Sequence, residues 1–293
     1  AASPASRLSA LVKIVGLLPT HTRRSEEAQT FQQFSTPIPL GLAALTAATL
    51  APADRVLDPS AGTGLLAVLA ETAGASLILN ELAETRADLL AALFPAVAVT
   101  RFDAAQIDDH LAPGATPSVV LMNPPFSAMA NVSGRVADAA YRHVASALAR
   151  LADGGRLVAI TGANFSSDHP AWAAAFVRLQ ERGRVVFYAK HGTTIDTRLT
   201  VIDKLPADDR SAFPASPGIA PDVATLLDWI ETQVPPRATS TLPPVETSGS
   251  AATPRTVRGY LARTTAARRA TPSSIEPEGV ELAYETLDWT PAE

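Results

Sequence analysis

One short motif combines residue types that suit chemistry on a weakly nucleophilic nitrogen. Asn123-Pro124-Pro125-Phe126 directly follows the apolar run 119–122. The lone pair of an exocyclic purine amine is delocalised into the ring, so such an amine needs help to react. The Asn123 side-chain oxygen and the Pro124 carbonyl oxygen can accept its hydrogens and favour the geometry in which the nitrogen becomes tetrahedral. The prolines stiffen the backbone, and Phe126 offers a stacking face for an extruded base. The alternative interpretation is a Pro-rich turn that packs one Phe.

A second motif lies 65 residues upstream, where Asp58-Pro59-Ser60-Ala61-Gly62-Thr63-Gly64 follows another short apolar run. Gly62 and Gly64 allow a sharp turn from strand to helix and a close approach of a ligand. No Gly-Lys-Ser/Thr follows, which argues against a nucleoside triphosphatase, and the dinucleotide pattern Gly-x-Gly-x-x-Gly is absent. Asp58 suits a ligand with a cationic amino group. An ordinary strand–glycine–helix turn is the alternative.

Two more acidic residues stand where a nucleoside would need them. Glu81 comes 23 residues after Asp58, close to the spacing of an acid that holds ribose hydroxyls in related sheets. Asp103-Ala104 ends the third expected strand, where Asp103 can accept a hydrogen bond from an adenine amino group and Phe102 can cover the ring. Asp103 could instead cap a helix. In this order, the motifs predict methyl transfer from S-adenosylmethionine to a planar, conjugated nitrogen.

Strand and helix patterns alternate around these motifs, which predicts a mostly parallel sheet with helices on both faces. The expected strands are 55–58, 76–80, 97–102, 118–122, 156–161, 184–188 and 200–202. The expected helices are 6–18, 39–50, 65–73, 85–94, 136–151, 172–181 and 223–232. The acids and the amide then fall at carboxyl ends of strands, where open α/β sheets bind ligands.

The ordered motifs resemble those of the gamma-type N6-adenine DNA methyltransferases, in which the cofactor motif precedes the catalytic one. The resemblance implies a class I methyltransferase fold with a seven-stranded sheet, S-adenosylmethionine as cofactor, and base flipping of adenine toward Asn123–Phe126. It also implies that Thr36, in Phe34-Ser35-Thr36-Pro37, touches the cofactor's carboxylate. The implied cofactor-binding residues are Thr36, Asp58, Pro59, Ser60, Ala61, Gly62, Gly64, Glu81, Asp103, Ala104 and Asn123.

The expected domains are a helical extension (1–30), a methyltransferase domain (31–205) and a Pro-rich tail with one short helix (206–293). The tail holds 12 of the 24 prolines and a stretch of arginines around Tyr260, which we interpret as solvated. It is a poor match for the target-recognition domain that such DNA enzymes usually add. The segments 127–135 and 189–199 are therefore the candidates for substrate contact. More narrowly, the chain resembles the methyltransferase domain that precedes a Strawberry-notch-type helicase in bacterial mobile-element proteins, which implies a fused or associated helicase as partner.

Composition narrows the classes of function. The chain of 293 residues has a net charge of −5, unlike a strong non-specific nucleic-acid binder. There are no cysteines, which excludes disulfides, thiolate metal sites and cysteine nucleophiles. The five histidines show no metal-ligand spacing and are expected to be structural or exposed. No apolar stretch reaches membrane-spanning length and no signal peptide is recognisable, so we expect a cytoplasmic protein without membrane contact.

The residues leave two other functions open. An Asn-Pro-Pro-aromatic motif serves planar amines and amides alike, so the substrate is alternatively an RNA base or a protein glutamine amide. A non-catalytic, cofactor-binding module that docks a helicase is the second alternative. The intact Asp58, Glu81 and Asn123 argue against it, because such a module need not keep them.

Overall fold

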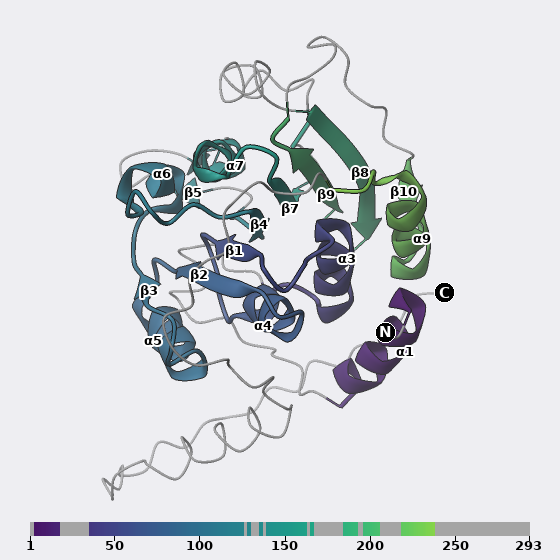
Figure 1. Cartoon of the computed structure of the whole chain (residues 1–293). Coiled ribbons are helices and arrows are strands. Elements are labelled where there is room, and N and C mark those ends of the chain that lie inside the picture. The colour runs from purple at the N-terminus through teal and green to yellow at the C-terminus, as the bar shows by residue number, and fades with distance from the viewer. Residues whose placement is uncertain are drawn as a thin grey trace, which may run out of the picture. The chain divides into compact units, whose positions relative to one another are not determined.

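An eight-stranded sheet lies at the centre of the computed structural model (Figure 1). The model describes residues 3–17, 35–125, 128–129, 135–136, 139–162, 165–166, 184–192, 196–205 and 218–237. All of these fall within one compact unit, Ala1–Pro254. The strands of the large sheet are β1 (Arg55–Asp58), β2 (Ser76–Asn80), β3 (Val99–Thr100), β4 (Val119–Met122), β7 (Arg156–Gly162), β8 (Arg184–Gly192), β9 (Asp196–Asp203) and β10 (Ile219–Ala220).

The strand order is β10-β8-β9-β7-β4-β1-β2-β3. Only β9 runs antiparallel to its neighbours β7 and β8, and the other pairs are parallel. This arrangement confirms the expected mostly parallel sheet, with the short edge strand β10 as one strand more than expected. The strand expected over 97–102 is reduced to Val99–Thr100. One reason is that the Phe102 amide donates to the side chain of Asn80 and not to a backbone partner.

Helices cover both faces of the sheet. They are α1 (Pro4–Val15), α3 (Ile38–Ala48), α4 (Leu65–Thr72), α5 (Glu84–Leu93), α6 (Ile107–His110), α7 (Ala139–Arg150) and α9 (Val223–Gln233), with the short 3₁₀ helix η1 (Ala104–Gln106). Figure 1 shows α3, α4 and α5 on one side of the strands, and α6 and α7 on the other. Among the described helices, none has the length and apolarity needed to cross a bilayer.

The central strands are buried on both faces, as their continuous apolar sequences require. Successive side chains of β4 point to opposite faces: Val119 and Leu121 pack with α3 and α9, whereas Val120 and Met122 pack with α6 and α7. A third cluster joins α5 to β2 through Leu79, Leu90 and Phe94. These cores fix which strand ends lie beside which helix.

Several expected elements differ from the structure. Asp108-Asp109, expected in a loop, lie in α6, where the Asp108 amide donates to the Ser146 hydroxyl of α7. Val136, expected to start a helix, pairs with Ala128 in a two-stranded sheet formed by β5 (Ala128–Met129) and β6 (Arg135–Val136). The helix expected over 172–181 lies outside the described residues.

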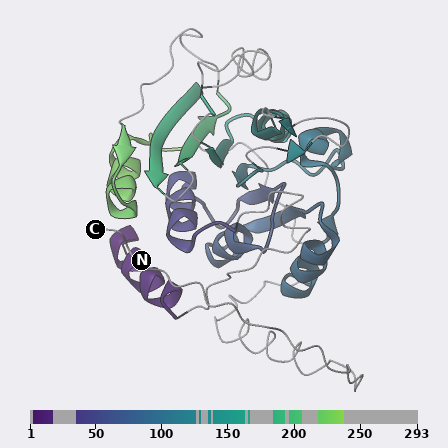
Figure 2. The same ribbon diagram turned by 180° about the vertical axis from the view of Figure 1, so that it is seen from behind.

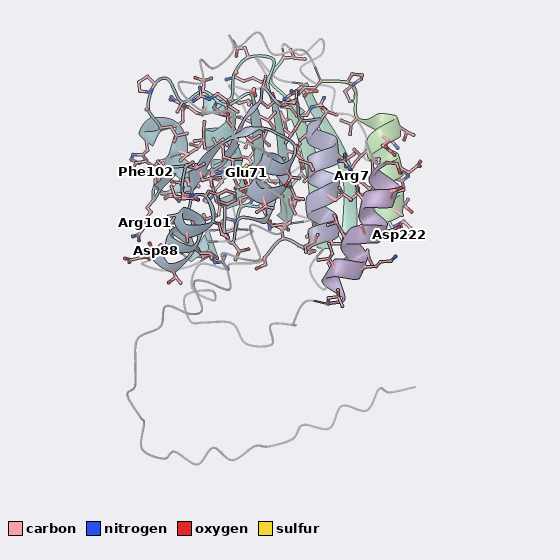
Figure 3. All side chains as sticks on the ribbon, turned by 60° about the horizontal axis from the view of Figure 1, so that its bottom comes forward. Arg7, Glu71, Asp88, Arg101, Phe102 and Asp222 are labelled. Carbon is pink, nitrogen blue, oxygen red and sulfur yellow. The ribbon has the colours of Figure 1, made fainter. Side chains whose placement is uncertain are left out.

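Both ends of the described chain pack on the face that α3 covers. Helix α1 contacts α3 and α9, with Leu8 and Leu11 against the core (Figures 2 and 3). Helix α9 confirms the expected helix 223–232 and buries Leu226, Leu227 and Ile230. The packed core thus extends beyond residue 205, where the catalytic domain was expected to end. The nature of the chain after residue 237 stays a prediction.

Candidate functional site

An open cleft of about 850 Å³ lies where β1, β2, β3 and β4 end. The chain runs outward from β1 to β3 and then returns to the other side of β1 as β4. Such a point of reversal is where open α/β sheets bind ligands. The predicted site residues that line it are Thr36, Asp58, Pro59, Ser60, Ala61, Gly62, Glu81, Asp103, Ala104, Asn123, Pro124 and Pro125.

The glycine turn after β1 has the backbone that its sequence predicts. Gly62 and Gly64 have φ angles of 57° and 87°, in the region that favours glycine. Gly64 is the N-cap residue of α4 and, unlike the other predicted residues of this motif, does not line the cleft. A Cβ atom on Gly64 would approach Leu90 Cδ2 to 2.9 Å. Gly64 therefore lets the turn before α4 lie close to α5, while the Gly62 amide donates to Glu81.

Asp58 is buried at the end of β1, with 2% of its surface exposed. Burial raises the pKa of its carboxyl group to about 8; the hydrogen bond from the Ser60 amide lowers it, and the negative charge of Glu81 raises it further. A cationic amino group beside Asp58 would favour the ionised carboxylate. This position thus suits the ligand that the sequence predicts.

Glu81 is held by backbone amides on both of its carboxylate oxygens. Oε2 accepts from the Gly62 amide at 2.8 Å, and Oε1 accepts from the Ala83 amide at 2.9 Å. Each oxygen of an ionised carboxylate can accept more than one hydrogen bond. The carboxylate is therefore fixed in direction and still has acceptor capacity toward the cleft, as the binding of ribose hydroxyls requires.

Asn80, to which sequence reasoning gave no role, joins three strand ends. Its Nδ2 donates to the carbonyls of Pro59 and Phe102, both at 2.9 Å. Its Oδ1 accepts from the Thr100 hydroxyl at 2.9 Å and from the Phe102 amide at 2.8 Å. The hydrogen-bonding capacity of this fully buried amide is thereby used. The sequence signal for this role is the position of Asn80, an amide residue at the end of an apolar strand.

Asp103 caps η1, which was the alternative that its sequence position left open. Its Oδ1 accepts from the Ala105 amide at 2.9 Å, and the residue lines the cleft. Beside it, Phe102 stacks on His110 with ring centroids 4.6 Å apart. Capping orients the Asp103 side chain, and its role toward an adenine amino group stays a prediction.

The Asn123 side chain forms a hydrogen bond with Thr36, which lies 87 residues earlier in the sequence. Asn123 Nδ2 donates to Thr36 Oγ1 at 3.0 Å. With the amide nitrogen engaged by Thr36, Oδ1 is the end that remains to accept a hydrogen bond from a substrate. Pro124 and Pro125 follow in the cleft wall, whereas Phe126 lies outside the described residues.

His143 is the second cleft residue without a predicted role. The sequence predicts a structural or exposed histidine at this position. His143 is buried in α7 and also lines the cleft. Burial lowers the pKa of its imidazole to about 4; the nearby Asp103 raises it, and Arg142 lowers it. No motif surrounds His143 in the sequence, so only the packing of α7 on η1 brings it to the cleft.

The two segments expected to contact substrate are described only in part. Of 127–135, residues 128–129 and 135 lie in the β5–β6 pair. Of 189–199, Lys190 and His191 lie in β8, and Thr193 and Thr194 fall outside the described residues. Arg198 of β9 donates to the Phe165 carbonyl at 2.7 Å. Their role in substrate contact stays a prediction.

Similarity to known proteins is visible in the structure and not in the sequence. No protein-family profile matches the chain, and no curated protein has a significantly similar sequence. Among solved structures, the M protein of the type I restriction enzyme EcoKI has a TM-score of 0.51 at 16% identity, covering 61% of this chain and 45% of its own. The methyltransferase subunit of a Streptococcus thermophilus type I restriction-modification system has a TM-score of 0.54 at 17% identity, with coverages of 68% and 53%.

A putative class I S-adenosylmethionine-dependent methyltransferase from Listeria monocytogenes has a TM-score of 0.52 at 14% identity, and the alignment covers 78% of this chain and 77% of that one. The chain spans about half the length of the two type I subunits. At these identities the likeness concerns the fold alone. The chain has the class I methyltransferase fold, as its motifs predict.

Proposed function

We propose that this chain transfers the methyl group of S-adenosylmethionine to the N6 amino group of adenine in DNA. The observation that carries the proposal is the convergence of four polar side chains on one cleft: Asp58, Glu81, Asp103 and Asn123. Asp58 ends β1, and the other three follow β2, β3 and β4, the neighbouring strands of the sheet. The likeness of the fold to the modification subunits of type I restriction enzymes gives further support.

The cleft residues fit S-adenosylmethionine group by group. The buried Asp58 carboxylate receives the cationic amino group, and the oriented Glu81 receives the ribose hydroxyls. The remaining oxygen of Asp103 accepts from the adenine amino group. Helix α3 begins at Ile38, directly after Thr36-Pro37, and the partial positive charge of its N-terminus favours the cofactor's carboxylate. When bound, the cofactor supplies an electrophilic methyl group.

The substrate amine is held by acceptors. The two hydrogens of N6 are accepted by Asn123 Oδ1 and by the Pro124 carbonyl. The hydrogen bond from Asn123 Nδ2 to Thr36 orients Oδ1 for this role. These hydrogen bonds favour a tetrahedral nitrogen whose lone pair points at the methyl group. On transfer, the new N–C bond would form as the S–C bond of the bound cofactor breaks, which would leave neutral S-adenosylhomocysteine and a positively charged amine, and the excess proton would then pass to water. Adenine in a duplex must leave the base stack to reach this site, and we assign Phe126 to stacking on it.

The test is a methyl-transfer assay with labelled S-adenosylmethionine on double-stranded DNA, single-stranded DNA, structured RNA and a protein lysate. Asn123→Ala removes the acceptor, and Thr72→Ala, on the exposed side of α4, is the matched control. We expect N6-methyladenine in digested DNA with the wild type and Thr72→Ala, and at least a hundredfold less with Asn123→Ala.

Label in RNA or in protein glutamine would support the methyl-transfer chemistry and show that the substrate is not adenine in DNA. Binding of the cofactor without any transfer, also when a helicase is added, would contradict the proposal and favour the docking module. The gamma-type assignment and the link to a Strawberry-notch-type helicase belong to the same proposal. A target preference that appears only with the helicase would support that link.

A further inference from the structure

His143 lies at the end of the cleft where a purine ring would bind. It shares the cleft wall with Phe102, Asp103 and Ala104, which follow β3. Helix α7, which carries it, packs against η1, and the charge of Asp103 acts on the imidazole. His143 and Asp103 therefore approach the same part of the cleft from two different elements.

The imidazole has a hydrogen-bonding atom that the protein does not use. His143 Nδ1 is buried and has no hydrogen-bond partner in the part of the chain that the structure describes. The residue is 9% exposed. A buried polar atom without a partner destabilises the fold by about 1–3 kcal/mol. His143 itself lines the cleft, so a rotation of its ring on binding would let a ligand supply that partner.

The protonation state of His143 limits what that partner can be. With a pKa lowered to about 4, chiefly by burial, the ring is uncharged near neutral pH. The charged groups that act on it are Asp103, at the start of η1, and Arg142 of α7; His110 of α6 stacks on Phe102. A neutral imidazole carries its proton on one of its two nitrogens. With that proton on Nε2, the Nδ1 atom presents a lone pair that a donor on the ligand can satisfy.

We infer that His143 Nδ1 and the Asp103 carboxylate together accept the two hydrogens of the cofactor's 6-amino group, so that His143 is a purine-recognition residue of the cofactor site. This inference rests on the proposed function, since it takes an adenosyl cofactor as the ligand. It makes the cleft specific for a 6-amino purine. A 6-oxo purine would place its carbonyl oxygen, an acceptor, against the two acceptors His143 Nδ1 and the Asp103 carboxylate, which is unfavourable.

The experiment compares two ligands and three forms of the full chain by calorimetry. The ligands are S-adenosylhomocysteine and its analogue with hydrogen in place of the 6-amino group. The forms are the wild type, His143→Phe, which keeps a ring without nitrogen, and His143→Asn, whose amide can reach the position of Nδ1. We expect His143→Phe to weaken S-adenosylhomocysteine binding about five- to tenfold, the loss of one hydrogen bond. The same variant should change binding of the analogue less than about twofold, and His143→Asn should stay within about threefold of wild type for both ligands.

Equal weakening of both ligands by His143→Phe would assign the residue to packing and overturn the inference, as would no weakening at all. In both cases the wild type still binds S-adenosylhomocysteine, so the proposed function stands. Absence of binding by the wild type would overturn both.

If His143→Phe does not fold, the inference is tested instead by nitrogen NMR of the wild type. The chain has five histidines, and His143→Asn assigns the signal. A shift of the Nδ1 resonance with S-adenosylhomocysteine and not with the analogue supports the inference, and identical spectra overturn it.

Discussion

The raised pKa of Asp58 links its ionisation to ligand binding. The folded-state pKa of about 8 lies above the ordinary 3.8, so the folded state without ligand favours the protonated carboxyl group. The stability that this protonation provides is complete below pH 4 and is lost as the pH rises through 8. A cationic amino group stabilises the carboxylate instead. Binding of such a ligand should therefore expel the proton.

This coupling predicts release of nearly one proton when S-adenosylhomocysteine binds at pH 6.5, and much less at pH 8.5, where Asp58 is already largely ionised. Calorimetry in buffers of different ionisation enthalpy measures the number of protons released. 5′-Methylthioadenosine, which lacks the amino acid part, is the control and should release none. Equal release at the two pH values would contradict the role of Asp58.

Thr36 Oγ1 accepts a hydrogen bond from Asn123 Nδ2 at 3.0 Å, so in the proposed reaction Thr36 acts on the substrate amine through Asn123. Thr36→Val keeps the shape of the side chain and removes the hydroxyl. We expect kcat to fall about tenfold, the equivalent of one well-placed hydrogen bond, because the Asn123 amide loses its fixed orientation. Thr36→Ser restores the acceptor and should recover kcat to within about threefold. Equal kcat values for the Val and Ser variants would exclude this positioning role.

At the level of elements, Asn80 holds the ends of β1, β2 and β3 in register around the cleft. Asn80→Ala would leave buried carbonyls of Pro59 and Phe102 without their partner. Each buried group that loses its partner costs about 1–3 kcal/mol. We therefore expect a loss of about 3 kcal/mol in the free energy of unfolding, measured by urea denaturation, and weaker binding of S-adenosylhomocysteine.

Leu77→Ala is the matched control for Asn80→Ala. Leu77 lies on the same strand, packs against the core and does not line the cleft. Its truncation should cost about 2–3 kcal/mol of stability and leave ligand affinity unchanged at low temperature. If both variants weaken binding equally, Asn80 contributes to stability alone.

At the scale of the whole molecule, the buried Arg156 and the partly buried Arg237 bind the chain after α9 to the end of the sheet opposite the cleft. Arg156 pairs with Asp203 at 2.6 Å and donates to the Pro235 carbonyl at 2.8 Å. Arg237 Nη2 donates to both carboxylate oxygens of Asp54, at 2.9 and 2.7 Å, across 183 residues. These contacts join residues 235–237 to the starts of β1 and β7.

Arg237→Met keeps much of the apolar stem and removes the positive charge, which leaves the buried Asp54 carboxylate without its cation. We expect a loss of about 3 kcal/mol in the free energy of unfolding, part of which Asp54→Asn should restore in the double variant. Arg7→Met, on an exposed site of α1, should change stability by less than about 0.5 kcal/mol. Equal stability of the two single variants would show that the Arg237–Asp54 pair contributes little.

Much of the fold and of the cleft could be predicted because the signals are local. Val56-Leu57-Asp58 followed by a glycine turn specifies a strand, a tight turn and a helix within a few residues. Since parallel strands end at the same edge, Asp58, Glu81, Asp103 and Asn123 had to converge once the alternation of strands and helices was recognised. The same locality made the helix over 223–232 predictable and left open whether it packs on the core.

The sequence by itself therefore determined the class of fold, the glycine turn and the four polar side chains that surround the cleft. The tertiary structure alone decided that Thr36 orients Asn123, that Asn80 joins three strands, that His143 enters the cleft from α7, and that Arg237 holds Asp54. The physical reason is that each of these contacts joins residues far apart in the chain. Such pairs are selected by which helix covers which face of the sheet, and no local pattern of residues encodes that choice.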